Sequence, residues 1–260
     1  ADVMKRIAAP MLGGVGTALL LELIVFPAIF SFWRSPESRK VIRVPPSESD
    51  TIVRTNDRDY WERHERNYDA SLRWVLGRPL PRMLELASEA VRGKARVLEV
   101  AAGTGIVTSA LAQTSDHVVA TDYAAAMVDA LEQRVQGAGL ENVTCEQADI
   151  YALPYSAGEF DAVVAANVLH LVPDLPAALQ ALRKVVKPGG LLVAPTFCHD
   201  ETKLSWMVSR VLAVSGFPGH RRFTMQSLRS ALEDNGLHVA RAEILSGLIP
   251  IGFVAADFES

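Results

Sequence analysis

From about residue 55 onward, short apolar runs alternate with amphipathic stretches. Apolar runs rich in Val, Leu and Ile predict buried strands at 96–100, 117–121, 142–147, 160–166 and 191–196. Between them, apolar residues recur every three or four positions, which predicts helices at 106–113, 125–136 and 175–186. Strands that alternate with helices in this way form a mostly parallel sheet with helices on both faces.

The last part of the chain breaks this alternation. A helix is predicted at 224–235, followed by strands at 238–244 and 249–256 that are close enough in sequence to pair as a hairpin. Asp174 is a suitable N-cap for the helix that follows it, and Pro188-Gly189-Gly190 is expected to end that helix. The fold class is therefore α/β: a Rossmann-like, seven-stranded, mostly parallel sheet with an antiparallel C-terminal hairpin.

The apolar run before residue 34 shows neither the alternation of a strand nor the three-to-four-residue period of an amphipathic helix. Met11–Trp33 is almost wholly apolar, with Glu22 as its one charge, and as a helix it would extend ~35 Å, enough for a bilayer core. A single membrane anchor is the preferred interpretation. A hairpin or interfacial segment bent at Pro27, and a soluble lid or oligomerisation helix, are the alternatives. No small-x-small site follows the run, so a cleaved signal peptide is disfavoured.

A charged, proline-containing stretch follows the apolar run and reads as a linker. We therefore expect residues 1–49 to form the anchor-like segment and linker, and residues 50–260 the folded α/β domain. More positive charges follow the run than precede it, which favours a cytoplasmic location for this domain. A soluble cytoplasmic protein is the alternative location.

Composition narrows the function. The net charge of -4 argues against a nucleic-acid groove, which usually needs clustered Lys and Arg. Two cysteines, Cys145 and Cys198, are too few for a disulfide framework or a zinc site, and no metal is expected. Three of the six histidines, His64, His199 and His220, lack metal-ligand spacing and are interpreted as surface residues.

The candidate chemistry follows the first strand. Glu99-Val-Ala101-Ala-Gly103-Thr-Gly105 leads from that strand into a helix, and its small residues let backbone approach a ligand closely. Such a turn could equally serve a dinucleotide. Asp122 ends the second strand and Asp149 follows the third, each where open α/β sheets bind ligands.

Each acid has a plausible partner. Asp122 can accept hydrogen bonds from two ribose hydroxyls, and Asp149 from an adenine amino group. Ile150 and Tyr123 offer apolar faces to the adenine ring. Any one acid alone is more often a strand-end cap, so the prediction rests on the series.

These residues resemble the class I S-adenosylmethionine (SAM)-dependent methyltransferase family. Glu99 to Gly105 is similar to the family's first motif, with Ala101 in place of its first glycine. The resemblance implies that Asp122 binds ribose, that Met127 lies beside the adenine, and that Asp149 binds the adenine amino group.

The resemblance covers about residues 60 to 256. The stretches at 153–161 and 184–190 look like those of quinone-biosynthesis and small-molecule methyltransferases. Tyr68 matches an aromatic position that closes over the cofactor in this family, with core packing as the alternative. The family's two C-terminal strands agree with the predicted hairpin.

No catalytic signature is obvious, because methyl transfer depends largely on positioning the acceptor. His170, just beyond the fourth strand, could act as a general base or simply pack the following helix. Asn167 is expected to line the methionine end of the cofactor, or else to cap the strand. The amino-methylating motif, Asn or Asp before Pro-Pro-aromatic, is absent, which disfavours a nucleic-acid acceptor.

The sequence thus predicts a SAM-dependent methyltransferase of a small, lipophilic acceptor such as a quinone precursor, a phospholipid or a related metabolite. A membrane contact through residues 11–33 is part of this hypothesis. The alternatives are a soluble methyltransferase of a polar metabolite and a non-catalytic SAM-fold interaction protein. An NAD(P) enzyme shares the turn and Asp122, but it does not account for Asp149 or the terminal hairpin.

Overall fold

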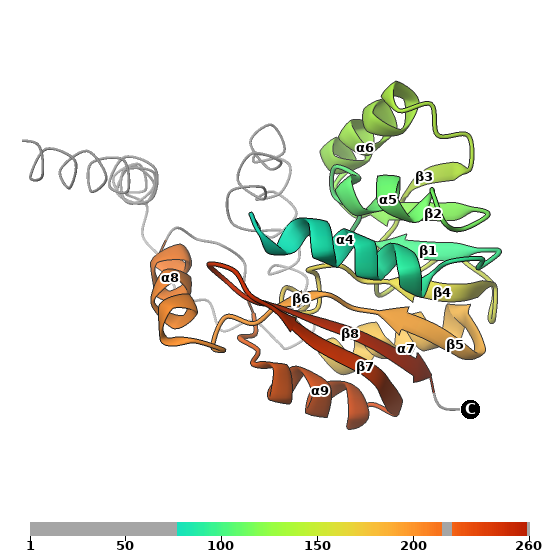
Figure 1. Cartoon of the computed structure of the whole chain (residues 1–260). Helices are drawn as coiled ribbons and strands as arrows, with labels where there is room; N and C mark the ends of the chain where they lie inside the picture. Colours follow the sequence, from blue (N-terminus) through green and yellow to red (C-terminus); the bar gives the residue numbers. More distant parts are fainter. Residues whose placement is uncertain (1–76, 215–219, 259–260) are drawn as a thin grey trace, which may run out of the picture.

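An eight-stranded mixed sheet forms the centre of the protein (Figure 1). The computed structural model describes residues 77–214 and 220–258. The strand order is β3-β2-β1-β4-β5-β8-β6, with β7 paired to β8. The parallel strands are β1 (Val97–Val100), β2 (Val118–Asp122), β3 (Val143–Gln147), β4 (Phe160–Val164) and β5 (Val186–Val193). The order reverses between β1 and β4, and ligands bind open α/β sheets outside the carboxyl ends at such a point.

The predicted C-terminal hairpin is confirmed. Strands β7 (Leu237–Leu245) and β8 (Ile251–Phe258) pair antiparallel, and β8 also runs antiparallel to β5. The sheet has one strand more than the predicted seven, because the predicted strand at 191–196 is divided. Its end forms β6 (Thr196–Phe197) beyond Pro195, which has no N–H to donate to the ladder.

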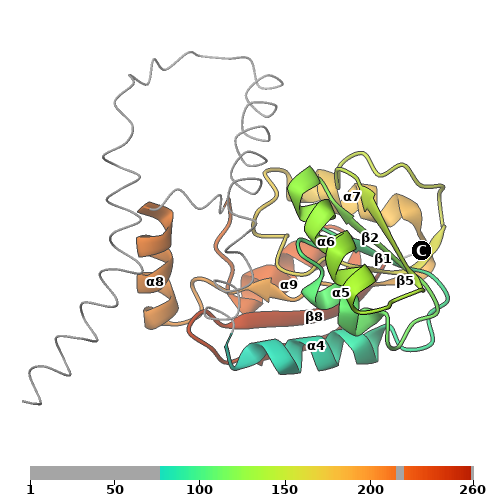
Figure 2. The same cartoon turned by 90° about the horizontal axis from the view of Figure 1, so that it is seen from above.

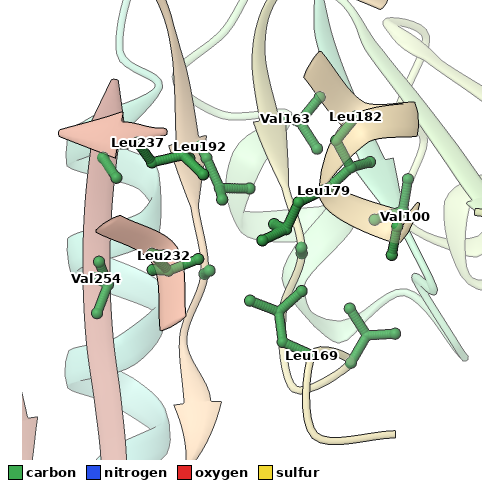
Figure 3. Packing of buried hydrophobic residues seen from close by; sticks show 14 of the residues in the cluster. Val100, Val163, Leu169, Leu179, Leu182, Leu192, Leu232, Leu237 and Val254 are labelled. Carbon is green, nitrogen blue, oxygen red and sulfur yellow. The ribbon is translucent and has the colours of Figure 1, made fainter. Parts of the chain in front are cut away.

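Helices cover both faces of the sheet, as predicted. One face packs against α4 (Pro79–Ala90), α5 (Ile106–Leu111) and α6 (Ala125–Gly137). The opposite face packs against α7 (Leu175–Val185) and α9 (Met225–Glu233). Figure 3 shows the second core, where Leu179 and Leu182 of α7 meet Val163 and Leu192 of the sheet. The alternation of side chains along each strand supplies both cores.

Helix boundaries test the local predictions. The Asp174 side chain accepts a hydrogen bond from the Ala177 N–H at 3.0 Å, so the predicted N-cap is confirmed. Pro188-Gly189-Gly190 does not end the helix, which stops at Val185; these residues lie within β5, beside a register shift. A Cβ on Gly190 would lie 2.2 Å from Val186 Cγ1, so this irregular turn needs glycine.

Two helices were not predicted: α4, and α8 (Lys203–Val214), which follows β6. Within residues 77–214 and 220–258, no helix is long and apolar enough to cross a membrane. The apolar segment 11–33, the linker and Tyr68 lie outside the described residues, and so does the expected boundary near residue 50.

Candidate cofactor and acceptor site

The loop between β1 and α5 is wound by three residues with positive φ. Ala101, Gly103 and Gly105 have φ values of 53°, 56° and 84°. The Ala102 N–H donates to the Thr121 carbonyl of β2 at 2.9 Å, and the Gly105 N–H donates to the Ala102 carbonyl at 3.0 Å. The left-handed conformation is strained for alanine, so Ala101, in place of the family's first glycine, adds strain to the loop.

Gly105 is fixed by its surroundings as well as by its φ. A Cβ there would lie 2.5 Å from Leu131 Cδ1 and 3.3 Å from Arg134 Cδ, both on α6. Arg134 Nε also donates to the Thr104 carbonyl at 2.5 Å. Helix α6 therefore supports the loop directly. The contact of Arg134 with the loop was not predicted, although Arg134 lies one turn beyond Leu131 on the same helix.

Glu99 lies in β1 with only 1% of its surface exposed. Burial raises the pKa of this carboxyl to about 8, and the Asp122 charge adds to the increase while the Thr108 hydroxyl opposes it. Its Oε2 atom is buried and has no hydrogen-bond partner. An acceptor buried in this way fits a ligand that brings a donor or a positive charge.

Asp122 ties the loop to the end of β2. Its Oδ2 accepts from the Gly103 N–H at 2.9 Å and its Oδ1 accepts from the Ala124 N–H at 3.0 Å. Burial raises the pKa of Asp122, and these backbone donors oppose that effect. An ionised carboxylate has about four lone-pair positions, so both oxygens can still accept a ligand hydroxyl.

The end of β3 lies next to Asp122. The Ala148 N–H donates to the Asp122 carbonyl at 3.0 Å, which brings Asp149 and Ile150 to the same edge. Asp149 Oδ1 accepts from the Tyr151 N–H at 3.0 Å in a local turn. Tyr123 and Ile150 are half-buried, whereas Met127 is 2% exposed and has little surface left for a ring.

Asn167 follows β4 in a strained conformation. Its φ is 53°, its N–H donates to the Pro195 carbonyl at 2.6 Å, and its Nδ2 points at Met83 Sδ of α4 at 3.8 Å. Its Oδ1 is buried with no hydrogen-bond partner. Residues held at unfavourable φ often mark functional sites. Neither the conformation nor the contact with α4 could be read from the sequence.

His170 and His199 lie together beyond β4 and β6. Their ring centroids are 5.3 Å apart, and Phe197 lies edge-on to His170 at 5.5 Å. His199 is 5% exposed, so the prediction of a surface residue was wrong; its Nδ1 lies 2.7 Å from the Ser209 hydroxyl of α8. His220 is exposed, as predicted, and His64 lies outside the described residues.

Both buried imidazoles are neutral. Burial lowers the pKa of His170 well below its ordinary value, and the nearby His199 acts in the same direction. Burial and the Arg222 charge lower the pKa of His199 to about 4, which Asp200 partly opposes. Neutral imidazoles beside Phe197 make this end of the site aromatic and weakly polar. In the described part of the chain, no group of His, Cys, Asp and Glu side chains could hold a metal ion.

Three kinds of comparison relate this chain to known proteins. Residues 98–194 match the family model described as "Methyltransferase domain". Among solved structures, a SAM-dependent methyltransferase from Aquifex aeolicus superposes with a TM-score of 0.60 at 21% identity, covering 76% of this chain and 98% of the other. At that identity, the likeness establishes the fold.

Curated relatives match the same part of the chain. A demethylmenaquinone methyltransferase of Clavibacter sepedonicus is 38% identical over 102 residues, which cover 39% of this chain and 41% of the relative. A protein-L-isoaspartate O-methyltransferase of Bradyrhizobium sp. is 32% identical over 115 residues, covering 44% and 51% respectively. The chain thus spans about half or less of the length of these relatives.

The mostly parallel sheet carries the loop after β1 and the acids at the carboxyl ends of its strands, which is where open α/β sheets bind ligands. The family match makes this more specific: residues 98–194 match the model of a methyltransferase domain, and the fold is that of a SAM-dependent methyltransferase of known structure.

Proposed function

We propose that this chain binds SAM at the carboxyl ends of β1 to β4 and transfers its methyl group to a small, lipophilic acceptor. The observation that carries the proposal is the linked set of Glu99, the 101–105 loop and Asp122, joined by the Gly103-to-Asp122 hydrogen bond at 2.9 Å. Asp149 lies beside this set through the Ala148 contact. The family and fold supply the identity of the cofactor.

The residues present fit SAM. Glu99 Oε2 and Asn167 Oδ1 are buried acceptors without partners, which suits the ammonium of a bound amino acid. Asp122 retains lone pairs for ribose hydroxyls, and Asp149 and Ile150 lie where adenine would follow. The closely wound loop lets backbone approach the ligand, because Gly103 and Gly105 have no side chain in the way.

SAM supplies an electrophilic methyl group on a sulfonium. The contribution of this chain is to hold the acceptor in line with that methyl, and orientation of this kind can account for much of the acceleration. We assign His170 as the base for an acceptor hydroxyl because it lies just beyond β4 and its imidazole is unprotonated near neutral pH; its lowered pKa makes it a weaker base than a free histidine. Asn167 then lines the methionine end of the cofactor.

The lipophilic acceptor is supported by the aromatic, uncharged side chains of His170, Phe197 and His199. The Clavibacter relative is named for a quinone, demethylmenaquinone, and the Bradyrhizobium relative for a protein isoaspartate. Among these two acceptor types, the quinone precursor fits the aromatic surroundings better. Phospholipids and related metabolites remain within the proposal because they are also lipophilic.

Location is part of the proposal. We infer that residues 11–33 hold the protein at a membrane, with the catalytic domain, residues 50–260, on the cytoplasmic side. The support is the long apolar run followed by basic residues. Fractionation followed by an alkaline carbonate wash tests it, and recovery of the full chain in the soluble fraction would remove the anchor. We also propose that Tyr68 is the aromatic residue that closes over the bound cofactor.

The cofactor is tested by calorimetry on the purified chain. SAM and its demethylated product are expected to bind, and NAD is not. Binding of NAD without SAM would overturn the proposal. Acceptor classes are then compared directly: a demethylated quinone in detergent against an isoaspartyl peptide, with radiolabelled SAM as donor. Methylation of the peptide alone would exclude the lipophilic acceptor, and profiling of a strain that lacks the gene would identify the natural one.

A further inference from the structure

Helix α8 exposes three large apolar side chains. Its residues Ser205 and Ser209 face the domain, at 0% and 4% exposure, and Val208 packs against the core. Leu204, Trp206 and Met207 face outward, at 54%, 44% and 59% exposure. A surface helix normally places its apolar stripe against the core. In α9 of the same domain this rule holds, since Leu228 and Leu232 are buried. The outer face of α8 is therefore suited to an apolar environment.

The inward side of α8 is tied to the acceptor end of the site. The Ser209 hydroxyl lies 2.7 Å from His199 Nδ1, and the ring centroids of His199 and His170 are 5.3 Å apart. Ser205 bonds to Thr202 at the start of the helix at 3.0 Å. Figures 1 and 2 both show α8 standing out at the end of the sheet reached by β6, away from the helices that cover the two faces. Whatever the outer face of α8 meets is therefore close to the acceptor.

Charge and size favour a lipid surface as the occupant. The charged residues of α8 are Lys203 and Arg210, both basic. The Arg210 guanidinium lies 4.8 Å from the centre of the Trp206 ring. Tryptophan with flanking basic residues is typical of helices that lie in a bilayer interface. Three exposed apolar side chains are also far fewer than the 20–30 residues that each partner contributes to a stable protein interface.

We propose that Leu204, Trp206 and Met207 of α8 insert into the headgroup region of an anionic bilayer, and that this contact holds the acceptor end of the site against the membrane. Lys203 and Arg210 then meet the lipid phosphates. The contact lies outside residues 11–33 and does not depend on them. Its role in acceptor capture rests on the proposed function; the lipid contact itself does not.

The test measures how close Trp206 comes to lipid in the full-length chain. Vesicles of phosphatidylcholine with about one-third phosphatidylglycerol carry acyl chains brominated near the headgroup, which quench nearby tryptophans. The quenching that disappears in Trp206→Phe belongs to Trp206. We expect Leu204→Ser combined with Met207→Ser to weaken the Trp206-lipid contact by about tenfold. Ile244→Ser, which removes another exposed apolar side chain (40%) on β7, is the matched control and should change nothing.

The outcomes separate cleanly. Equal quenching in the parent and in Trp206→Phe would overturn the proposal, and so would equal quenching in vesicles without phosphatidylglycerol. A face covered by a second copy or by another part of this chain would give that first result. Calorimetry keeps the two hypotheses distinct: the double variant should bind SAM as the parent does. If no variant binds SAM while Trp206 is still quenched, the proposed function fails and the lipid contact stands.

Discussion

Replacing Glu99 by Gln should change how stability depends on pH. Glu99 is 1% exposed and its pKa rises from 4.5 to about 8 on folding, mainly because burial disfavours the charged form. The folded state therefore holds a proton that the unfolded state releases as pH increases. Stability from this group is fully present below pH 4.5 and is lost as pH rises towards 8.

The magnitude follows from the two pKa values. A difference of about 3.5 pH units corresponds to about 5 kcal/mol in total, of which about 3 kcal/mol is lost by pH 7. Gln has no proton to exchange in this range. The free energy of unfolding of Glu99→Gln should therefore rise relative to the parent by about 1.4 kcal/mol per pH unit between about pH 5 and pH 8. Any fixed effect of the amide shifts the whole curve and leaves this slope unchanged.

Urea unfolding without SAM, followed by circular dichroism at several pH values, measures the slope. Glu132→Gln, on the exposed side of α6, is the control. Its free energy of unfolding should depend on pH in the same way as that of the parent. If the stability of Glu99→Gln shows the same pH dependence as that of the parent, the Glu99 carboxyl is solvated or paired. That result would refute the argument for an electrostatically strained site. Calorimetry should show weaker SAM binding to Glu99→Gln, since the amide cannot ionise to pair with the ammonium of SAM.

Four further substitutions test the loop and its acid. Ala101→Gly should stabilise the domain by about 1 kcal/mol, because φ is 53° there. Ala102→Gly, the matched control, should destabilise the domain by about 0.5–1 kcal/mol. Thermal melts measure whether each change raises or lowers the stability. Gly105→Ala should lower the melting temperature and weaken SAM binding, since its Cβ would lie 2.5 Å from Leu131 Cδ1, and an unchanged affinity would count against the loop as the binding site. Asp122→Ala should weaken SAM binding by about 1.5–3 kcal/mol per ribose bond lost, and also reduce stability, because the Gly103 N–H loses its acceptor; parental affinity in calorimetry would make Asp122 purely structural.

Much of the architecture was predictable from local patterns. The strands at β1 to β4 and the C-terminal hairpin were located to within two residues or so, and Asp174 was identified as an N-cap. Periodicity and capping depend on neighbours in sequence, so they survive without tertiary information. The same applies to the order of Glu99, Asp122 and Asp149 at successive strand ends, since parallel strands place their carboxyl ends at one edge.

The sequence by itself determined the fold class, the loop after β1 and the series of acids. Only the tertiary structure decided the rest. Pro188-Gly189-Gly190 belongs to β5 because it forms the irregular stretch between Val186, which pairs with Phe160 of β4, and Leu191, which pairs with Ala162. His199 is buried because α8 packs over it through Ser209. Leu204 and Met207 have helical spacing in the sequence, but only the tertiary structure shows that they face outward. Burial, pKa and exposed faces depend on residues far apart in sequence, and these are the properties that a periodicity cannot contain.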